Sequence, residues 1–194
     1  FGNWHCNGVT FFKKFSKLTQ NRNMVPELFV LPSRTLISGE KTLKLSRPIL
    51  MGILNTTPDS FSEDYSFFEF DDALSEARKI IADGADWLDI GGESSGPGSK
   101  EVPLEEELRR VIPLIKEVRS ESDIWISVDT WKAEVARQSL DAGADAVNDV
   151  SALRGDKKMA GVIAEYQVPV LLMYSKDSTP RTTRNHTEYL DVTH

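Results

Sequence analysis

The sequence predicts an α/β fold, in which a parallel β-sheet is covered by the helices that connect its strands. Two observations predict this fold. The apolar runs ILMGIL (residues 49–54) and VPVLLM (residues 168–173) lack the alternation of polar and apolar residues that a sheet with one wet face shows, which is typical of parallel strands buried on both faces. Between such runs lie segments with apolar residues at helical spacing, so strand and helix alternate in βαβ units.

The elements are expected in a regular order from residue 34 onward. Residues 34–45 contain two short apolar runs around the turn signal Ser38-Gly39, which predicts an N-terminal β-hairpin. Five strands are predicted after the hairpin, over residues 49–54, 87–90, 124–128, 146–150 and 168–174. The four helices between them are predicted over residues 71–83, 103–119, 132–141 and 157–166. Pro113 should kink the second of these helices.

A short internal repeat supports the βαβ organisation. Residues 84–89 (GADWLD) match residues 143–148 (GADAVN). In both copies a glycine is expected to close a helix, and a strand then delivers Asp89 or Asn148 near its carboxyl end. A helix stop alone explains the first three residues of each copy but not the shared polar position.

Long loops after the first two predicted strands favour a (β/α)8 barrel over a doubly wound sheet. A complete barrel usually takes about 250 residues. The chain offers 171 residues from Met24 onward. We therefore expect a (β/α)8 barrel that is truncated after about its fifth strand and preceded by the hairpin.

The charge of the chain is unevenly distributed. The net charge is −7, yet residues 1–23 carry only basic charges, from Lys13, Lys14, Lys17 and Arg22, so the remainder is strongly acidic. An acidic domain argues against nucleic acid as a partner. The sequence has no apolar run of the roughly 18 residues that would cross a membrane.

Residues 1–23 are predicted to be a non-native or disordered leader, and residues 24–194 the folded domain. The leader lacks the order of basic, apolar and small-residue regions of a signal peptide, and a weak organelle transit segment is the alternative. It contains Cys6, the only cysteine of the chain, so a disulfide framework within the chain is excluded. A reducing cytoplasm is the expected compartment.

Polar residues stand where the first two strands end, which is where α/β folds keep their ligand sites. The first strand leads into Asn55 and then into a long loop with Thr57, Pro58, Asp59 and Phe61. Taken alone, this loop is equally well explained as a solvated turn with a core anchor. The second strand ends in DIGGESSGPG, residues 89–98, whose glycine pair permits either a close approach to a ligand or a tight turn.

The third and fourth strands end near Asp129 and Asn148, which should lie beside each other on neighbouring strands. An acid that directly follows an apolar run is costly to bury unless it is hydrogen-bonded or paired. A bland interpretation is that Asp129 or Thr130 caps the next helix, and we expect Thr130 to do so, which leaves Asp129 to face the site. A carboxylate beside a carboxamide suits a flat heterocycle with amidine-like N–H edges, such as a pterin or guanine.

Five ordered motifs, GILNTTPDSFS, LDIGGESSGPG, ISVDTWKAEVA, VNDVSAL and TPRTT, resemble those of dihydropteroate synthase, a pterin-binding (β/α)8 barrel family of folate biosynthesis. The resemblance runs from about Leu45 to the end of the chain and makes residues 24–194 a pterin-binding domain. It implies a transferase that condenses 6-hydroxymethyl-7,8-dihydropterin diphosphate with 4-aminobenzoate and releases diphosphate. It also implies Mg²⁺ as a cofactor and, for the full-length protein, a homodimer.

The same resemblance implies roles for individual residues. Asp129 and Asn148 would bind the pterin, and Asn55 would ligate Mg²⁺, a cation that prefers oxygen ligands. The loop residues implied to shape the substrate sites are Thr57, Pro58, Asp59, Phe61 and Ser95. No catalytic nucleophile or base is identified, because diphosphate is a good leaving group and the protein has mainly to orient the reactants.

The sequence departs from the family pattern in its second loop. Gly96 stands where the family usually has an arginine that helps to hold diphosphate, and Ser95 stands where it usually has threonine. The family's remaining pterin and diphosphate ligands are expected beyond His194, so we expect residues 1–194 alone to be inactive or nearly so. Two alternatives stay open, the pterin-binding domain of a corrinoid-dependent methyltransferase and a non-catalytic pterin-binding paralogue.

Overall fold

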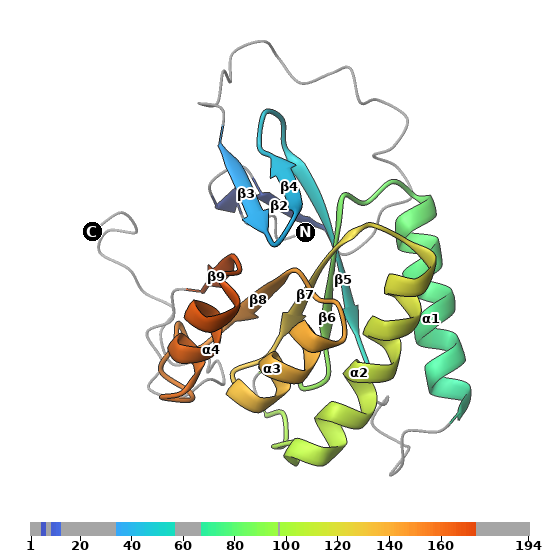
Figure 1. The fold of residues 1–194 in the computed structure, drawn as a ribbon. Helices are drawn as coiled ribbons and strands as arrows, with labels where there is room; N and C mark the ends of the chain where they lie inside the picture. The colour runs from blue at the N-terminus through green and yellow to red at the C-terminus, as the bar shows by residue number, and fades with distance from the viewer. Residues whose placement is uncertain (1–4, 7–8, 13–33, 57–66, 97, 174–194) are drawn as a thin grey trace, which may run out of the picture.

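The computed structural model describes residues 5–6, 9–12, 34–56, 67–96 and 98–173, and from residue 34 onward it has the predicted order of strands and helices (Figure 1). The strands are β1 (His5–Cys6), β2 (Val9–Phe12), β3 (Thr35–Ser38), β4 (Lys41–Lys44), β5 (Ile49–Asn55), β6 (Trp87–Gly91), β7 (Trp125–Asp129), β8 (Ala146–Asp149) and β9 (Val170–Leu172). The helices are α1 (Phe67–Ala82), α2 (Leu104–Glu121), α3 (Ala133–Asp141) and α4 (Met159–Tyr166).

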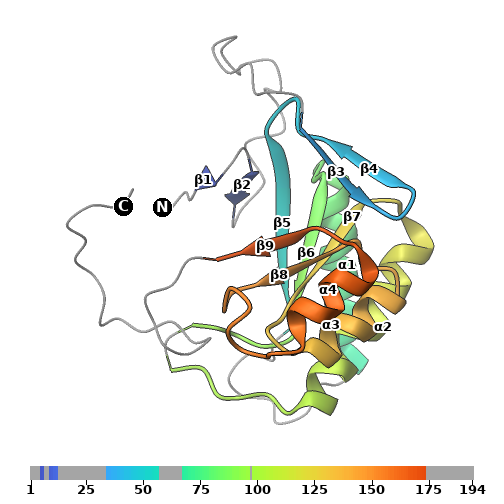
Figure 2. The same ribbon diagram turned by 60° about the vertical axis from the view of Figure 1, so that its left-hand side comes forward.

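Seven of these strands form one sheet in the order β1-β2-β5-β6-β7-β8-β9, and β3 pairs with β4 as a separate hairpin. From β2 to β9 every neighbouring pair is parallel, whereas β1 and β2 are antiparallel. The four helices lie together on one side of the sheet (Figure 1, Figure 2). The predicted α/β fold, with a parallel sheet and an N-terminal β-hairpin, is confirmed.

Several boundaries differ from the predicted ones. Helix α1 begins at Phe67 rather than at residue 71, and β9 spans only Val170–Leu172, in register with residues 147–149 of β8. Helix α2 continues through Pro113, whose predicted kink stays a prediction. Within the predicted leader, β1 and β2 extend the sheet beside β5. The assignment of residues 1–23 as a leader separate from the domain also stays a prediction.

The two faces of the sheet carry different layers, because successive strand residues point to opposite sides. On the helix face, strand residues such as Ile90 and Val128 are fully buried in the main apolar core. On the opposite face, Trp87 and Trp125 pack against each other with ring centroids 5.3 Å apart. The hairpin residues that pack on this layer are Leu36 and Leu43. The hairpin therefore covers the amino-terminal end of this face, and the polar strand ends lie at its other end.

The repeated Gly-Ala-Asp motif has the same structural role in both copies. In each copy the glycine that follows the helix has a positive φ, 93° and 109° respectively, a conformation that favours glycine. Asp86 then donates its N–H to the carbonyl of Leu50 at 2.9 Å and accepts the N–H of Leu50 at 3.1 Å. Asp145 makes the same two bonds to Ile126, at 2.7 and 2.9 Å. The repeat therefore ties the start of β6 to β5 and the start of β8 to β7.

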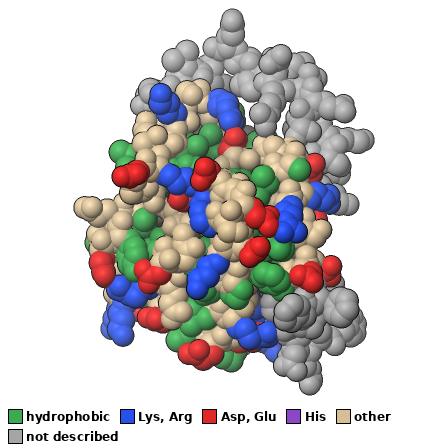
Figure 3. Space-filling model, turned by 45° about the vertical axis from the view of Figure 1, so that its right-hand side comes forward, with side chains coloured by type: hydrophobic (Ala, Val, Ile, Leu, Met, Phe, Trp, Pro, Cys, Tyr) green, Lys and Arg blue, Asp and Glu red, His purple; other side chains and the backbone are tan. Residues whose placement is uncertain are grey.

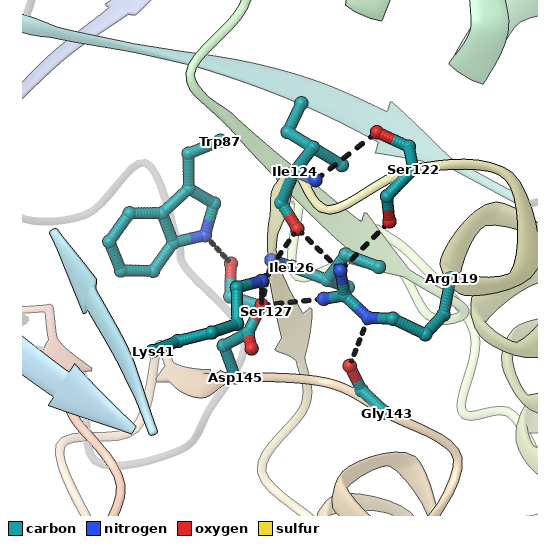
Figure 4. Close-up of polar contacts among 9 residues, drawn as sticks. All are labelled: Lys41, Trp87, Arg119, Ser122, Ile124, Ile126, Ser127, Gly143 and Asp145. Carbon is teal, nitrogen blue, oxygen red and sulfur yellow. Dashed lines mark hydrogen bonds and ion pairs between the residues drawn. The ribbon is translucent and has the colours of Figure 1, made fainter. Parts of the chain in front are cut away.

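Asp145 also holds the hairpin against the sheet (Figure 4). Its Oδ2 accepts hydrogen bonds from Lys41 Nζ at 2.8 Å and from Arg119 Nη2 at 2.6 Å. Lys41 lies in β4 and also donates to the carbonyl of Ile124 at 3.1 Å, while Arg119 donates to the carbonyl of Gly143 at 3.0 Å. Because the Asp145 side chain is only 8% exposed, these two cations neutralise a carboxylate that is nearly out of water.

The face shown in Figure 3 carries acidic and basic side chains that are interspersed. Arg78 of α1 pairs with Glu121 of α2, and Arg137 of α3 pairs with Glu165 of α4. These pairs are largely exposed and should contribute little to stability. In the part of the chain that the structure describes, no helix is both long and apolar enough to cross a membrane.

We predict that Asp145→Asn lowers the free energy of unfolding by about 3 kcal/mol, because it removes the carboxylate charge with which two partly buried cations, Lys41 and Arg119, are paired. Urea-induced unfolding followed by circular dichroism measures the change. Glu121→Gln, which removes an exposed ion pair, is the matched control and should leave the unfolding midpoint nearly unchanged. Equal midpoints for the two variants would contradict the role assigned to Asp145.

Candidate functional site

The carboxyl ends of four neighbouring strands place their terminal residues in one row across the sheet. Asn55 of β5 is in register with Gly91 of β6, Gly91 with Asp129 of β7, and Asp129 with Asn148 of β8. Residues in register on parallel strands project from the same face and lie roughly 5 Å apart. The predicted proximity of Asp129 and Asn148 is therefore confirmed, and Asn55 joins them across Gly91.

Gly91 allows the side chains of Asn55 and Asp129 to approach each other. A Cβ atom built on Gly91 would lie 3.5 Å from Asn55 Oδ1 and 3.6 Å from Asp129 Oδ2. Both oxygens therefore stand over a residue that has no side chain of its own. The space above Gly91 is bounded by one carboxamide and one carboxylate oxygen, and both are hydrogen-bond acceptors.

Asp89 lies two residues before Gly91 on the same face and supports the row from below. It accepts a hydrogen bond from Asn148 Nδ2 at 2.9 Å and another from Ser127 Oγ. Ser127 in turn accepts from Trp87 Nε1 at 2.8 Å. This series of hydrogen bonds orients the carboxamide of Asn148. The Oδ1 atom and the second amide hydrogen of Asn148 are the groups that remain for a ligand.

Sequence reasoning did not assign Asp89 to the site, although one signal pointed to it. The internal repeat gives Asp89 and Asn148 equivalent positions in its two copies. In the structure these two residues are hydrogen-bonded to each other. Their equivalence could not show the contact, because the bond depends on the offset between β6 and β8 in the folded sheet.

The two aspartates have raised pKa values for different reasons. Burial raises the pKa of Asp89 to about 6, and the hydrogen bonds from Ser127 and Asn148 partly oppose that effect. Burial also raises the pKa of Asp129 well above its ordinary value, and the neighbouring carboxylates of Asp89, Glu107 and Asp149 raise it further. Among the described residues, none donates a hydrogen bond to the carboxylate of Asp129. Asp129 is half-buried, and a carboxylate in such a place without a donor is the expected state of a ligand-binding group.

The remaining predicted site residues are only partly within the described chain. Ser95 lies half-buried in the loop between β6 and α2, where it was expected. Thr57, Pro58, Asp59 and Phe61 lie outside the described residues. Their loop begins at Thr56, which donates from both its N–H and its hydroxyl to the carbonyl of Gly91, at 2.8 and 3.1 Å. The first loop therefore starts directly beside the row of strand ends.

The expectation that Thr130 caps the next helix is wrong. Helix α3 begins at Ala133, and its N-cap residue, Lys132, has no side-chain capping bond. The N–H of Ala133 is instead bound by Asp156 Oδ2 at 3.0 Å. The Thr130 hydroxyl accepts the N–H of Lys132 at 3.2 Å and donates to Glu107 at 2.7 Å. Asp129 is not a cap either, which agrees with its proposed place in the site.

The oxygen atoms at the carboxyl ends of the strands suit a hard cation as ligands only in part. Within the described residues, no group of three or more His, Cys, Asp and Glu side chains could hold a metal ion. Asn55 nevertheless presents a carboxamide oxygen at the exposed end of β5. A single oxygen ligand fits Mg²⁺, which usually keeps several waters and takes further ligands from substrate phosphates.

The fold and the site together define a class of protein, an α/β protein of the barrel type with hydrogen-bond acceptors gathered at the carboxyl ends of its strands. Residues 51–194 of the chain match the pterin binding enzyme family, and the chain belongs to that family.

The relatives of the chain agree with this assignment. It is 47% identical over 146 residues to the dihydropteroate synthase of Synechocystis sp. The aligned region covers 75% of this chain and 50% of that protein. It is similar to the crystal structure of 7,8-dihydropteroate synthase from Vibrio fischeri ES114, with a TM-score of 0.67, 47% identity, and coverage of 75% of this chain and 52% of that one. It is also similar to Xanthomonas albilineans dihydropteroate synthase in complex with 7,8-dihydropteroate, with a TM-score of 0.63, 42% identity, and coverage of 73% and 51%.

The chain spans about half the length of the curated relatives that it matches. The likeness to solved synthases confirms the predicted (β/α)8 class, to which the described strands and helices contribute the part from β5 to β9. The predicted family is confirmed as well.

We predict that Gly92→Ala and Gly91→Ala have different effects. A Cβ on Gly92 would lie 2.9 Å from Glu107 Cγ and from Val111 Cγ1, so overpacking should lower the free energy of unfolding by about 1 to 3 kcal/mol. A Cβ on Gly91 meets only ordinary contacts, the shortest at 3.4 Å, so its stability should stay within about 0.5 kcal/mol of the wild type. Urea unfolding of both variants checks this difference, and a larger loss for Gly91→Ala would contradict it.

We predict that the raised pKa of Asp89 makes the protein less stable as the pH rises from about 4 to about 6. In this window the unfolded Asp89 has lost its proton while the folded one retains it, so each rise in pH favours unfolding. Asp89 should contribute a loss on the order of 2 to 3 kcal/mol. Asp89→Asn cannot titrate, so its stability should fall less over the same range. Urea unfolding of both proteins at several pH values measures the difference. If the free energy of unfolding depends on pH in the same way in both proteins, the raised pKa is contradicted.

Proposed function

We propose that this chain is the pterin-binding part of a dihydropteroate synthase, which condenses 6-hydroxymethyl-7,8-dihydropterin diphosphate with 4-aminobenzoate to 7,8-dihydropteroate and diphosphate. The observation that carries the proposal is the row formed by Asn55, Gly91, Asp129 and Asn148. The similarity to synthases of 42 to 47% identity, one of them in complex with 7,8-dihydropteroate, supports the assignment of a substrate to that row.

The chemistry of the row suits a pterin. The ring of a pterin carries an amino group and ring N–H groups along one edge, and these donors need a set of acceptors at fixed positions. The carboxylate of Asp129 has no donor among the described residues, and Asp129 projects from the same face of the sheet as Asn148. Donors from the pterin would relieve the burial cost that raises the pKa of Asp129. Asp89 fixes the orientation of Asn148 before the ligand arrives.

The residues around the row would orient the reaction rather than form a covalent intermediate. The amine of 4-aminobenzoate attacks the methylene carbon of the pterin, the bond from that carbon to the diphosphate oxygen breaks, and the amine loses a proton. Asn55 would hold Mg²⁺, which neutralises charge on the departing diphosphate when it is bound. Thr57, Pro58, Asp59, Phe61 and Ser95 would shape the sites of aminobenzoate and diphosphate from the two loops.

The proposal includes three further points that come from the family resemblance. The substrates are small molecules rather than nucleic acid or membrane, the cofactor is Mg²⁺, and the full-length protein is a homodimer. The cytoplasm is the proposed compartment, in keeping with the single cysteine of the chain.

We predict that Asp129→Asn weakens binding of 6-hydroxymethyl-7,8-dihydropterin diphosphate by about 10- to 100-fold, the effect of losing one charge-assisted hydrogen bond. Isothermal titration calorimetry of the full natural protein, with and without Mg²⁺, measures it. Asn55→Ala should abolish the Mg²⁺ dependence while retaining affinity for the pterin without its diphosphate. Asp141→Asn, at the exposed end of α3, is the control and should bind like the wild type.

Two results would contradict the proposal. Wild-type binding that is indifferent to both Mg²⁺ and the diphosphate group would exclude a synthase. Binding of a methylated folate in preference to the pterin diphosphate would favour a methyltransferase domain instead.

A further inference from the structure

A buried ion cluster lies behind the row of strand ends and is not used by the mechanism above. Lys132, directly before α3, donates to Glu93 in the loop after β6 and to Glu107 in α2. The two glutamates are only 5% and 1% exposed. The third hydrogen bond of the Lys132 ammonium goes to the carbonyl of Val102 at 2.7 Å. All three donors of this ammonium are therefore used by groups from separate parts of the chain.

The cluster closes the base of the loop between β6 and α2. Glu93, at the start of this loop, binds the N–H of Val102, at its end, at 3.1 Å. Lys132 binds both residues at the same time. Arg110 of α2 adds a bond to the carbonyl of Gly92 at 2.9 Å. Residues 94–96, which include Ser95, and residues 98–101 therefore extend from a base whose two ends are joined to each other.

The same cluster reaches the residue next to Asp129. Glu107 uses one carboxylate oxygen for Lys132 and the other for the hydroxyl of Thr130, at 2.7 Å. The N–H of Thr130 binds the carbonyl of Asn148 at 3.1 Å. A short path of hydrogen bonds thus runs from the base of the loop, through Lys132 and Glu107, to Thr130. This residue directly follows Asp129 and is bonded to Asn148.

Stability alone does not account for this arrangement. Two buried carboxylates share one ammonium, and one of them, Glu107, lies near enough to Asp129 to help raise its pKa. Apolar residues of similar volume would often give equal or better stability than a buried ion cluster. Buried charges with every bond satisfied do, however, impose one geometry on the segments that carry them.

We propose that Lys132 is a positioning residue that holds the β6–α2 loop at a set place relative to Asp129, so that a ligand bound at the strand ends meets Ser95. The inference rests on the proposed function for the identity of that ligand. It predicts that the charge and the reach of Lys132 affect the affinity for the ligand and not only the stability of the fold.

The test compares Lys132→Met with Lys41→Met in the full natural protein. Lys41 is a matched control because it also bridges a buried carboxylate and a backbone carbonyl, but at the opposite end of the sheet. Under conditions in which both variants are folded by circular dichroism, Lys132→Met should bind 6-hydroxymethyl-7,8-dihydropterin diphosphate at least 10-fold more weakly than the wild type. It should also speed hydrogen exchange at the Val102 amide by at least 10-fold. Lys41→Met should change neither quantity.

Thr130→Val provides a second variant in case Lys132→Met does not fold. It removes the hydroxyl that joins Glu107 to the residue directly after β7 and leaves both ion pairs in place. Protection of the Val102 amide should be kept while the affinity falls several-fold. Wild-type affinity in Thr130→Val, or in folded Lys132→Met, would overturn the inference.

The design separates the inference from the proposed function. If the wild type does not bind the pterin diphosphate, the proposed function fails, and the exchange of the Val102 amide still decides whether Lys132 holds the loop base. If the wild type binds and both variants bind equally well, the proposed function stands and the positioning role is rejected.

Discussion

The register of the parallel strands is the constraint on which the candidate site depends. Asn55, Gly91, Asp129 and Asn148 come from four strands, and they meet only because each strand is paired with the next at one particular offset. A slip of one residue in any pair would turn that side chain to the helix face. The Gly-Ala-Asp motifs help to hold the offset, since Asp86 and Asp145 each bind the second residue of the preceding strand.

The two ends of the sheet use buried carboxylates for opposite purposes. At the amino end, Asp145 is surrounded by Lys41, Arg119 and a backbone N–H, so its charge is fully compensated and it joins the hairpin to the sheet. At the carboxyl end, acidic groups outnumber cations, and Asp129 has neither a cation nor a donor among the described residues. That imbalance costs stability, and such costs are concentrated where a protein binds ligands.

Much of the fold was predictable because it depends on local patterns. The uninterrupted apolar runs and the amphipathic segments identified β5 to β9 and the four helices, with errors of a few residues at their ends. The polar residue after each strand could also be recognised, since parallel strands in such folds end at a common edge. The capping role of Thr130 was predicted wrongly because its hydroxyl binds Glu107, a residue 23 positions earlier in the sequence.

The sequence by itself determined the order of the elements, the α/β class and the identity of Asp129, Asn148 and Asn55 as strand-end residues, because these follow from spacing along the chain. Only the tertiary structure decided which of them touch. The bond between Asp89 and Asn148 joins residues 59 positions apart, and Lys132 meets Glu93 and Glu107 from 39 and 25 positions away. Such contacts depend on strand offset and helix packing, which are set by the whole folded domain and leave no periodic signal in the chain.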